Sequence, residues 1–77
     1  MDWEKIRNKY RINMEALRIL DALEPIYGKW GGFPISFYIA DYDEAIIKQV
    51  LSDFGYPNST TKHCPTDSTH YCVCVHL

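Results

Sequence analysis

Histidines and cysteines alternate with apolar residues at the C-terminal end of the chain, and these residues are the best suited to chemistry. They are His70, Cys72, Cys74 and His76. Thiolate sulfur and imidazole nitrogen are ligands that zinc prefers, and a thiol beside an imidazole can act as a nucleophile. Because successive residues of a strand point to opposite faces, these four side chains would share one face.

A preceding run places another histidine near this strand. Residues 65–68 read as a four-residue hairpin turn that sets His63 opposite His70. In that register the candidate metal ligands on one face are His63, His70, Cys72 and Cys74. Same-face neighbours on a strand are roughly 7 Å apart, however, and the C-x2-C spacing of zinc knuckles is absent. We therefore interpret these cysteines as small half-buried strand residues, with a zinc-binding domain on this hairpin as an alternative.

The same hairpin also holds the members of a cysteine and histidine pair, for example Cys72 with His70. A strand thiol has no helix N-terminus beside it to activate it, and no oxyanion hole or third orienting group is evident. Walker, dinucleotide, H-E-x-x-H and EF-hand motifs are absent from the sequence. We expect no catalytic residue, no cofactor and no enzymatic activity, and keep a small metal-dependent or thiol enzyme as a further hypothesis.

The elements that carry these residues follow from hydrophobic periodicity. Residues 2–24 lack glycine and proline and repeat apolar side chains every three or four positions, which predicts one amphipathic helix. A break near Asn13, whose side chain could cap a second helix, is the alternative. Pro25 is predicted to end the pattern, and the glycine-rich segment 28–32 to form a connector that carries Trp30.

Beyond the connector, the sequence predicts one helix and three strands. Residues 33–40 alternate strongly apolar with other side chains, as a half-buried strand does. A helix with a clear apolar stripe follows, bounded by Asp41 as N-cap and Gly55 as the stop. The runs 59–64 and 69–77 are β-prone and form the final hairpin.

The predicted order is α-β-α-β-β within one domain, residues 1–77. A chain of 77 residues has room for one core, and a hydrophobic fraction of 47% is ample to fill it. A strand-helix-strand unit favours a parallel pair, to which the hairpin adds an antiparallel neighbour. We therefore expect an α+β fold with two helices packed on one face of a small three-stranded mixed sheet, the other face being open.

Charge is unevenly distributed along the chain. Residues 1–18 hold five bases and three acids, whereas residues 19–77 hold three bases and seven acids. Arg7, Arg11 and Arg18 fall on a narrow stripe of the predicted first helix, where they could grip acidic side chains or phosphate. The acidic remainder argues against nucleic acid as the partner, so nucleic-acid binding through this helix stays an alternative.

Nothing in the sequence indicates export or membrane insertion. No run approaches the roughly 18 apolar residues that span a bilayer, and the chain opens with charge rather than a signal-peptide pattern. Three cysteines, an odd number near one end, do not match a disulfide-stapled secreted domain. We expect a cytoplasmic protein with reduced thiols and no membrane partner.

Together these features predict a small non-catalytic protein-binding module. A chain with 14% aromatic residues, one uncovered sheet face and no catalytic constellation is suited to present a surface to another protein. The expected contact residues on the open face and in the adjoining loops are Tyr38, Cys72, Cys74, His76, Trp30 and Tyr56. The same face could instead close a homodimer. A stand-alone inhibitor or modulator of a larger macromolecular machine, of the kind viruses and mobile elements encode, fits this size.

Overall fold

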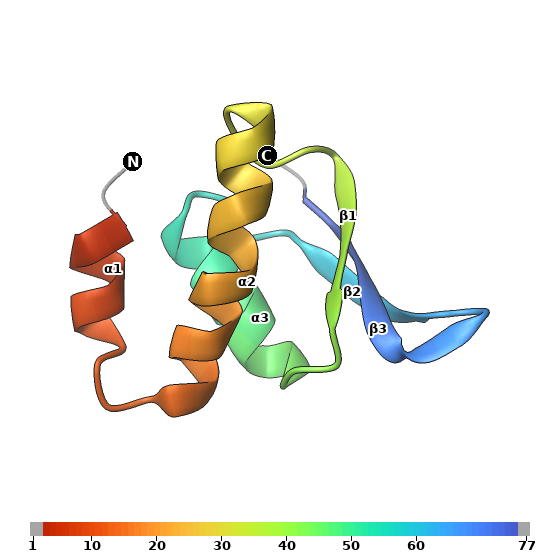
Figure 1. Ribbon diagram of the computed structural model, residues 1–77, viewed down its shortest axis with the longest axis horizontal. Helices are drawn as coiled ribbons and strands as arrows, with labels where there is room; N and C mark the ends of the chain where they lie inside the picture. Colours follow the sequence, from red (N-terminus) through yellow and green to blue (C-terminus); the bar gives the residue numbers. More distant parts are fainter. Residues whose placement is uncertain (1–2, 76–77) are drawn as a thin grey trace.

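The computed structural model describes residues 3–75, except for the side chains of residues 67 and 68. Within this range the helices are α1 (Trp3–Lys9), α2 (Met14–Trp30) and α3 (Glu44–Asp53), and the strands are β1 (Ser36–Ala40), β2 (Thr60–Cys64) and β3 (Asp67–Cys74). Figure 1 shows three layers, with the sheet on one side, α2 and α3 in the middle and α1 outermost. The predicted α+β fold, with two helices packed on one face of a three-stranded sheet, is confirmed.

The prediction of one continuous helix is wrong, because the chain turns between α1 and α2. Asn13 is extended and its side-chain oxygen accepts a hydrogen bond from the backbone N–H of Ala16 at 3.1 Å, so Asn13 is the N-cap of α2. The alternative of a break at this residue is therefore the correct one. α1 lies antiparallel beside α2 (Figure 1). The ring centroid of its Trp3 is 4.7 Å from that of Phe54.

α2 continues through Pro25 to Trp30, beyond the predicted end. Proline in a helix removes one backbone donor, and α2 tolerates that loss. The helix ends where Gly31 takes a left-handed φ of 68° and donates its N–H to the carbonyl of Tyr27. Trp30 is therefore the last residue of a helix rather than part of a loop.

The sheet is antiparallel throughout, with strand order β1-β3-β2. β1 and β2 run parallel to each other and α3 connects them, but β3 lies between them, so the predicted mixed sheet is wrong. Burial explains the order, because the inward side chains Tyr71 and Val73 of β3, and Val75 directly after it, are all buried. Thr61 and His63, which occupy the corresponding positions of β2, are more polar and suit an edge strand.

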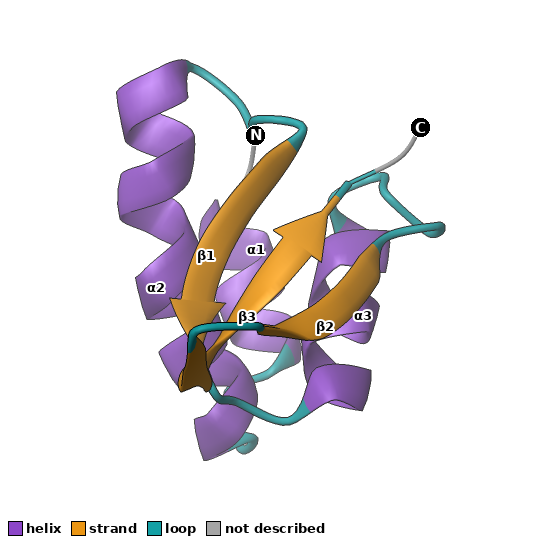
Figure 2. Cartoon of the chain, turned by 90° about the vertical axis from the view of Figure 1, so that its right-hand side faces the viewer, coloured by secondary structure: helices purple, strands orange, loops and turns teal. Residues whose placement is uncertain are grey.

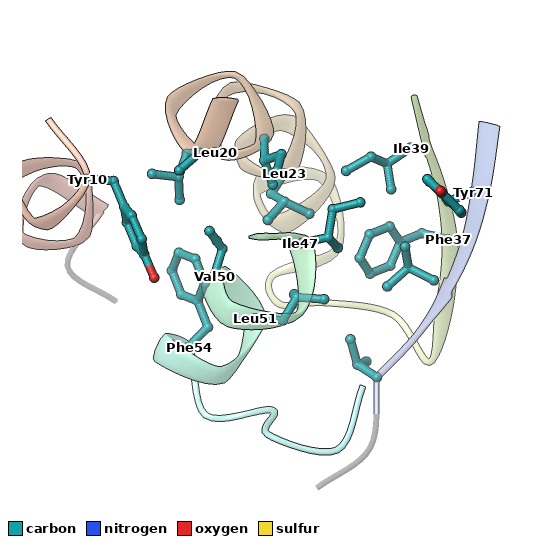
Figure 3. Packing of buried hydrophobic residues seen from close by; sticks show 14 residues of the cluster. Tyr10, Leu20, Leu23, Phe37, Ile39, Ile47, Val50, Leu51, Phe54 and Tyr71 are labelled. Atoms are coloured by element: carbon teal, nitrogen blue, oxygen red, sulfur yellow. The ribbon is translucent and has the colours of Figure 1, made fainter. Parts of the chain in front are cut away.

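The core lies between the sheet and the α2–α3 layer, as Figure 3 shows. The largest fully buried side chains are Ile19, Leu20, Leu23, Ile47, Val50, Leu51 and Val73. Burial of each such side chain contributes roughly 1.5–3 kcal/mol, so this set is the main source of stability. No helix in the described part of the chain is long and apolar enough to cross a membrane.

Candidate partner-binding surface

One face of the sheet carries none of the three helices (Figure 2). Strand alternation places on this open face the residues Ser36, Tyr38 and Ala40 of β1, Thr60 and Lys62 of β2, and His70, Cys72 and Cys74 of β3. Cys72 pairs with Tyr38 on one side and with Lys62 on the other. The structure thus brings together three of the predicted contact residues, Tyr38, Cys72 and Cys74.

His63 lies on the opposite face, because the predicted hairpin register is wrong by one residue. The turn comprises two residues rather than four, and the register shifts after His63. His63 therefore pairs with Tyr71 instead of His70, and the two rings of that pair stack with centroids 4.4 Å apart. Its Nε2 lies 3.5 Å from an Asp41 carboxylate oxygen.

The predicted metal ligands are consequently divided between the two faces of the sheet. Cys72, Cys74 and His70 share the open face, whereas His63 faces the helix side. Among the side chains that the structure describes, no three His, Cys, Asp or Glu are grouped to hold a metal ion. His76 lies outside the described residues.

The three cysteines are unpaired thiols at half-buried positions. Burial is the main cause that raises the pKa of the Cys72 thiol above its ordinary value of 9.0, and the neighbouring thiols of Cys74 and Cys64 add to it, while Lys62 acts in the opposite direction. A raised pKa keeps a thiol protonated at neutral pH, whereas a nucleophilic cysteine needs a lowered one. Cys72 therefore lacks the lowered pKa that a nucleophilic cysteine needs.

Exposed hydrophobic side chains gather where the end of α2 meets the start of β1. Ile35 is 81% exposed, Tyr38 66% and Trp30 63%, and we call these three residues the β1 patch. Trp30 and Tyr38 line a groove of about 450 Å³ between α2 and β1, to which Lys29 and Pro34 also contribute. Exposed apolar side chains beside a groove are typical of an interaction site.

Part of this surface was missed by the sequence prediction. Ile35 alternates with Phe37 and is therefore predicted to lie on the apolar face, but β1 begins only at Ser36 and Ile35 is 81% exposed. The sequence prediction ends the first helix at Pro25 and so places Lys29 in the connector, whereas α2 continues to Trp30. Pro34, two residues before Ser36, is a sequence signal that the strand starts late.

Tyr56 does not belong to this surface. Its ring contacts the ring of Phe33 edge-on, with centroids 5.7 Å apart, and its side chain is partly buried against the core. Phe33 in turn contacts Tyr27 and Phe54 at 5.2 and 5.5 Å. The structure therefore places Tyr56 in an aromatic cluster that closes the end of the core.

The three predicted arginines do not lie on one helix. Arg7 belongs to α1, Arg11 to the turn and Arg18 to α2, so the expected single stripe is wrong. Arg7 forms ion pairs with Asp21 at 2.6 Å and with Glu24 at 2.5 Å, which hold α1 against α2. Arg11 and Arg18 are exposed.

A second, larger groove of about 930 Å³ runs beside α1 and the turn that follows it. Its charged lining residues are Lys5, Lys9, Arg11 and Asp53. Lys9 is paired with Asp53 at 2.7 Å, so part of the positive charge is neutralised within the chain. This groove is of mixed charge, whereas β1 itself contains no charged residue.

The open face and the β1 patch form one continuous surface, because Tyr38 belongs to both. Its middle is uncharged, with Lys29 and Lys62 at the margins. Comparisons with protein-family models, with curated proteins and with solved structures found no match to this chain. Function is therefore inferred from the geometry of the chain itself.

Proposed function

We propose that this protein is a small non-catalytic binding module for another protein, with the β1 patch and the adjoining open sheet face as its contact surface. The observation that carries the proposal is that Trp30 and Tyr38, each more than 60% exposed, line one groove, and that the exposed Ile35 lies in the sequence between the groove residues Pro34 and Ser36. Burying a large apolar side chain is favourable by about 1.5–3 kcal/mol. Tryptophan and tyrosine are also the side chains most enriched at binding hot spots.

The distribution of charge supports the same surface. The centre of a protein interface is depleted of charged residues, and its rim is polar. Here the uncharged centre consists of Tyr38, Cys72 and Cys74, and lysines lie at two margins. The half-buried thiols add small apolar contact area without requiring a hydrogen-bond partner.

A role as an inhibitor or modulator of a larger macromolecular machine is the finer form of this proposal. A 77-residue domain that binds without performing chemistry acts by occupying a surface of its partner. Proteins of viruses and mobile elements often act in this way on host machinery. Unpaired cysteines at positions 64, 72 and 74 support a cytoplasmic setting for that interaction.

The experiment compares two double variants that each remove exposed apolar area from a different part of the surface. Trp30→Ala with Tyr38→Ser alters the β1 patch. Ile12→Ser with Met14→Ser is the matched control, because these residues are 90% and 65% exposed and lie in the α1–α2 turn and at the first position of α2, respectively. Both variants should keep the circular dichroism spectrum of the parent protein.

Each protein is immobilised, captured proteins are quantified by mass spectrometry, and the leading candidate is purified for calorimetric titration. We expect the parent and the control variant to bind it equally, and the β1-patch variant to bind at least about tenfold more weakly, or 1.4 kcal/mol. Equal binding by all three proteins would contradict the assignment of this surface. Unfolding of the β1-patch variant alone would show that its residues support the fold.

A further inference from the structure

The two edges of the sheet differ in their protection against strand addition. The β2 edge carries Lys62 and a register irregularity after His63, both of which discourage another strand from pairing. β1 contains no charged residue and pairs with β3 in unbroken register from Ser36 to Ala40. An uncharged, regular edge is a ready template for a further strand.

The ladder determines which backbone groups of β1 point away from the sheet. The N–H of Val75 donates to the carbonyl of Ile35 at 2.9 Å, so these two residues form a hydrogen-bonded pair of the antiparallel ladder. Hydrogen-bonded and non-hydrogen-bonded pairs alternate along such a ladder. The N–H and C=O groups of Ser36, Tyr38 and Ala40 therefore face the free edge.

Most of these groups have no partner within the described chain. The carbonyl of Ala40 accepts a hydrogen bond from the N–H of Tyr42 at 2.8 Å. The outward groups of Ser36 and Tyr38 are engaged by no other group of the described residues. A strand added at this edge would satisfy the N–H and C=O groups of both residues.

β1 is symmetric in side-chain size about its central residue. The two ends of β1 are the small residues Ser36 and Ala40. The large inward residues Phe37 and Ile39 come next, and Tyr38 is in the middle. A two-fold contact between identical chains sets the same patch against itself. Antiparallel pairing centred on Tyr38 places a small residue opposite a small residue and one tyrosine opposite the other.

Charge at the two ends of β1 favours the same arrangement. Lys29 lines the groove together with Pro34 and Ser36 at the start of β1, whereas Asp41 directly follows its end. The side chain of Asp41 is 50% exposed. Antiparallel pairing brings the start of one β1 to the end of the other, so Lys29 of each chain would face Asp41 of the second copy.

We propose that the occupant of the β1 edge is a second copy of this chain, paired antiparallel through β1 about Tyr38 into one sheet of twice the width. This inference rests on the proposed binding role of the β1 patch and names its partner. Ile35 and Trp30 lie beside the edge and supply apolar area for the contact. The open sheet face stays available to a foreign protein.

Sedimentation velocity over about 1–500 µM tests the dimer with a pair of lysine substitutions. Tyr38→Lys puts a charge on the β1 edge, and Thr60→Lys puts the same charge on the open face at the β2 edge as the control. We expect the parent and Thr60→Lys proteins to sediment at twice the 9.0 kDa chain mass, and Tyr38→Lys to be a monomer. A monomeric parent protein at every concentration would overturn the proposal, as would an unchanged dimer of Tyr38→Lys.

Two further measurements do not depend on the folding of the Tyr38 variant. In the parent protein, hydrogen exchange at the amides of Ser36 and Tyr38 should slow at least about tenfold between dilute and concentrated samples. Lys29→Asp should weaken the dimer about tenfold, and combination with Asp41→Lys should restore it. Concentration-independent exchange at both amides, or no restoration by the charge swap, would contradict pairing through β1.

The test of the dimer can fail while the proposed binding function holds, and the reverse is also possible. A monomer that still captures a foreign protein through Trp30 and Tyr38 overturns the dimer and leaves the binding role intact. A dimer that captures no protein upholds the inference and limits the β1 patch to self-association.

Discussion

The hydroxyl of Tyr10 donates a hydrogen bond to the carboxylate of Asp53, which also accepts from Lys9 Nζ at 2.7 Å. Tyr10 follows α1 and Asp53 is the last residue of α3, so this contact fastens the outermost helix to the core layer. Burial is the main cause that raises the pKa of the Tyr10 phenol, and the hydrogen bond to Asp53 adds to it. The phenol therefore stays protonated and remains a donor. Figure 3 shows the Tyr10 ring at the α1 side of the core.

Tyr10→Phe should lower the free energy of unfolding by about 1–2 kcal/mol, because a hydrogen bond to a charged group is lost while the ring is kept. Urea denaturation followed by circular dichroism measures the change. Tyr38→Phe is the control, because its side chain is 66% exposed, and its effect should stay within about 0.5 kcal/mol. Equal stability of the two variants would show that the contact contributes nothing.

Asp53 should make stability depend on pH in the acid range. Burial by itself acts to raise the pKa of Asp53, but hydrogen bonds from Lys9 and Tyr10 outweigh it and hold the pKa below the ordinary value of 3.8. A carboxylate whose pKa is lower in the folded state stabilises the fold fully above the unfolded-state pKa. That contribution is lost as the pH falls through the folded-state pKa.

The free energy of unfolding should therefore decline below about pH 4, near the unfolded-state pKa of aspartate. Urea midpoints between about pH 2.5 and 7 measure this decline. Asp53→Asn removes the titrating group, so its free energy of unfolding should be lower and should change less with pH. The difference between the two profiles is the contribution of Asp53, apart from that of the other acidic residues. Parallel profiles for the parent and the variant would argue against a role for Asp53.

Hydrophobic periodicity in the sequence was sufficient to predict the apolar stripe of α3 and the inward residues of β1, because both depend on interactions between residues close in the sequence. The α3 stripe was predicted correctly, although its N-cap is Asp43 rather than Asp41, and Asp43 accepts hydrogen bonds from the N–H groups of Ala45 and Ile46 at 2.9 and 3.3 Å. The inward alternation of Phe37 and Ile39 along β1 is also local, because it follows from strand geometry alone. Both residues are buried as predicted.

The errors concern relations between distant segments. Whether β1 pairs with β2 or with β3 depends on which strand buries more apolar surface at the centre of the sheet, and Val73 decides this in favour of β3. The hairpin register depends on an irregularity after His63, and Pro65 indicates a turn there without fixing its length. A one-residue slip moves a side chain to the other face, so His63 was wrongly joined to the cysteines.

The break between α1 and α2 offers a direct test of a local signal. Asn13→Ala removes the side-chain acceptor for the Ala16 N–H and should cost about 1 kcal/mol, a decrease in melting temperature of roughly 4–8 °C. Asn13→Asp keeps an acceptor at the same position and should retain most of the stability. Thermal unfolding of the three proteins measures both effects. A more helical Asn13→Ala protein of unchanged stability would instead show that the cap does not hold the break in place.

The Cys72 thiol should react more slowly than an ordinary cysteine at neutral pH. Its pKa is raised, chiefly by burial and also by the thiols of Cys74 and Cys64, and only the thiolate is nucleophilic. Each unit by which the pKa is raised lowers the thiolate fraction at pH 7.5 about tenfold. Alkylation by iodoacetamide, resolved by peptide mass spectrometry, should therefore be slower at Cys72 in the folded protein than in urea.

The rate at Cys72 should still be rising at pH 9, the ordinary pKa of a thiol. Cys74→Ala removes one of the neighbouring thiols and should shift the profile toward lower pH, whereas a chelator should leave the parent protein unchanged. A fast reaction with a plateau below pH 8 would indicate a thiolate at neutral pH and would reopen the thiol-enzyme hypothesis. Protection of Cys72 that only a chelator removes would show that the open face binds a metal.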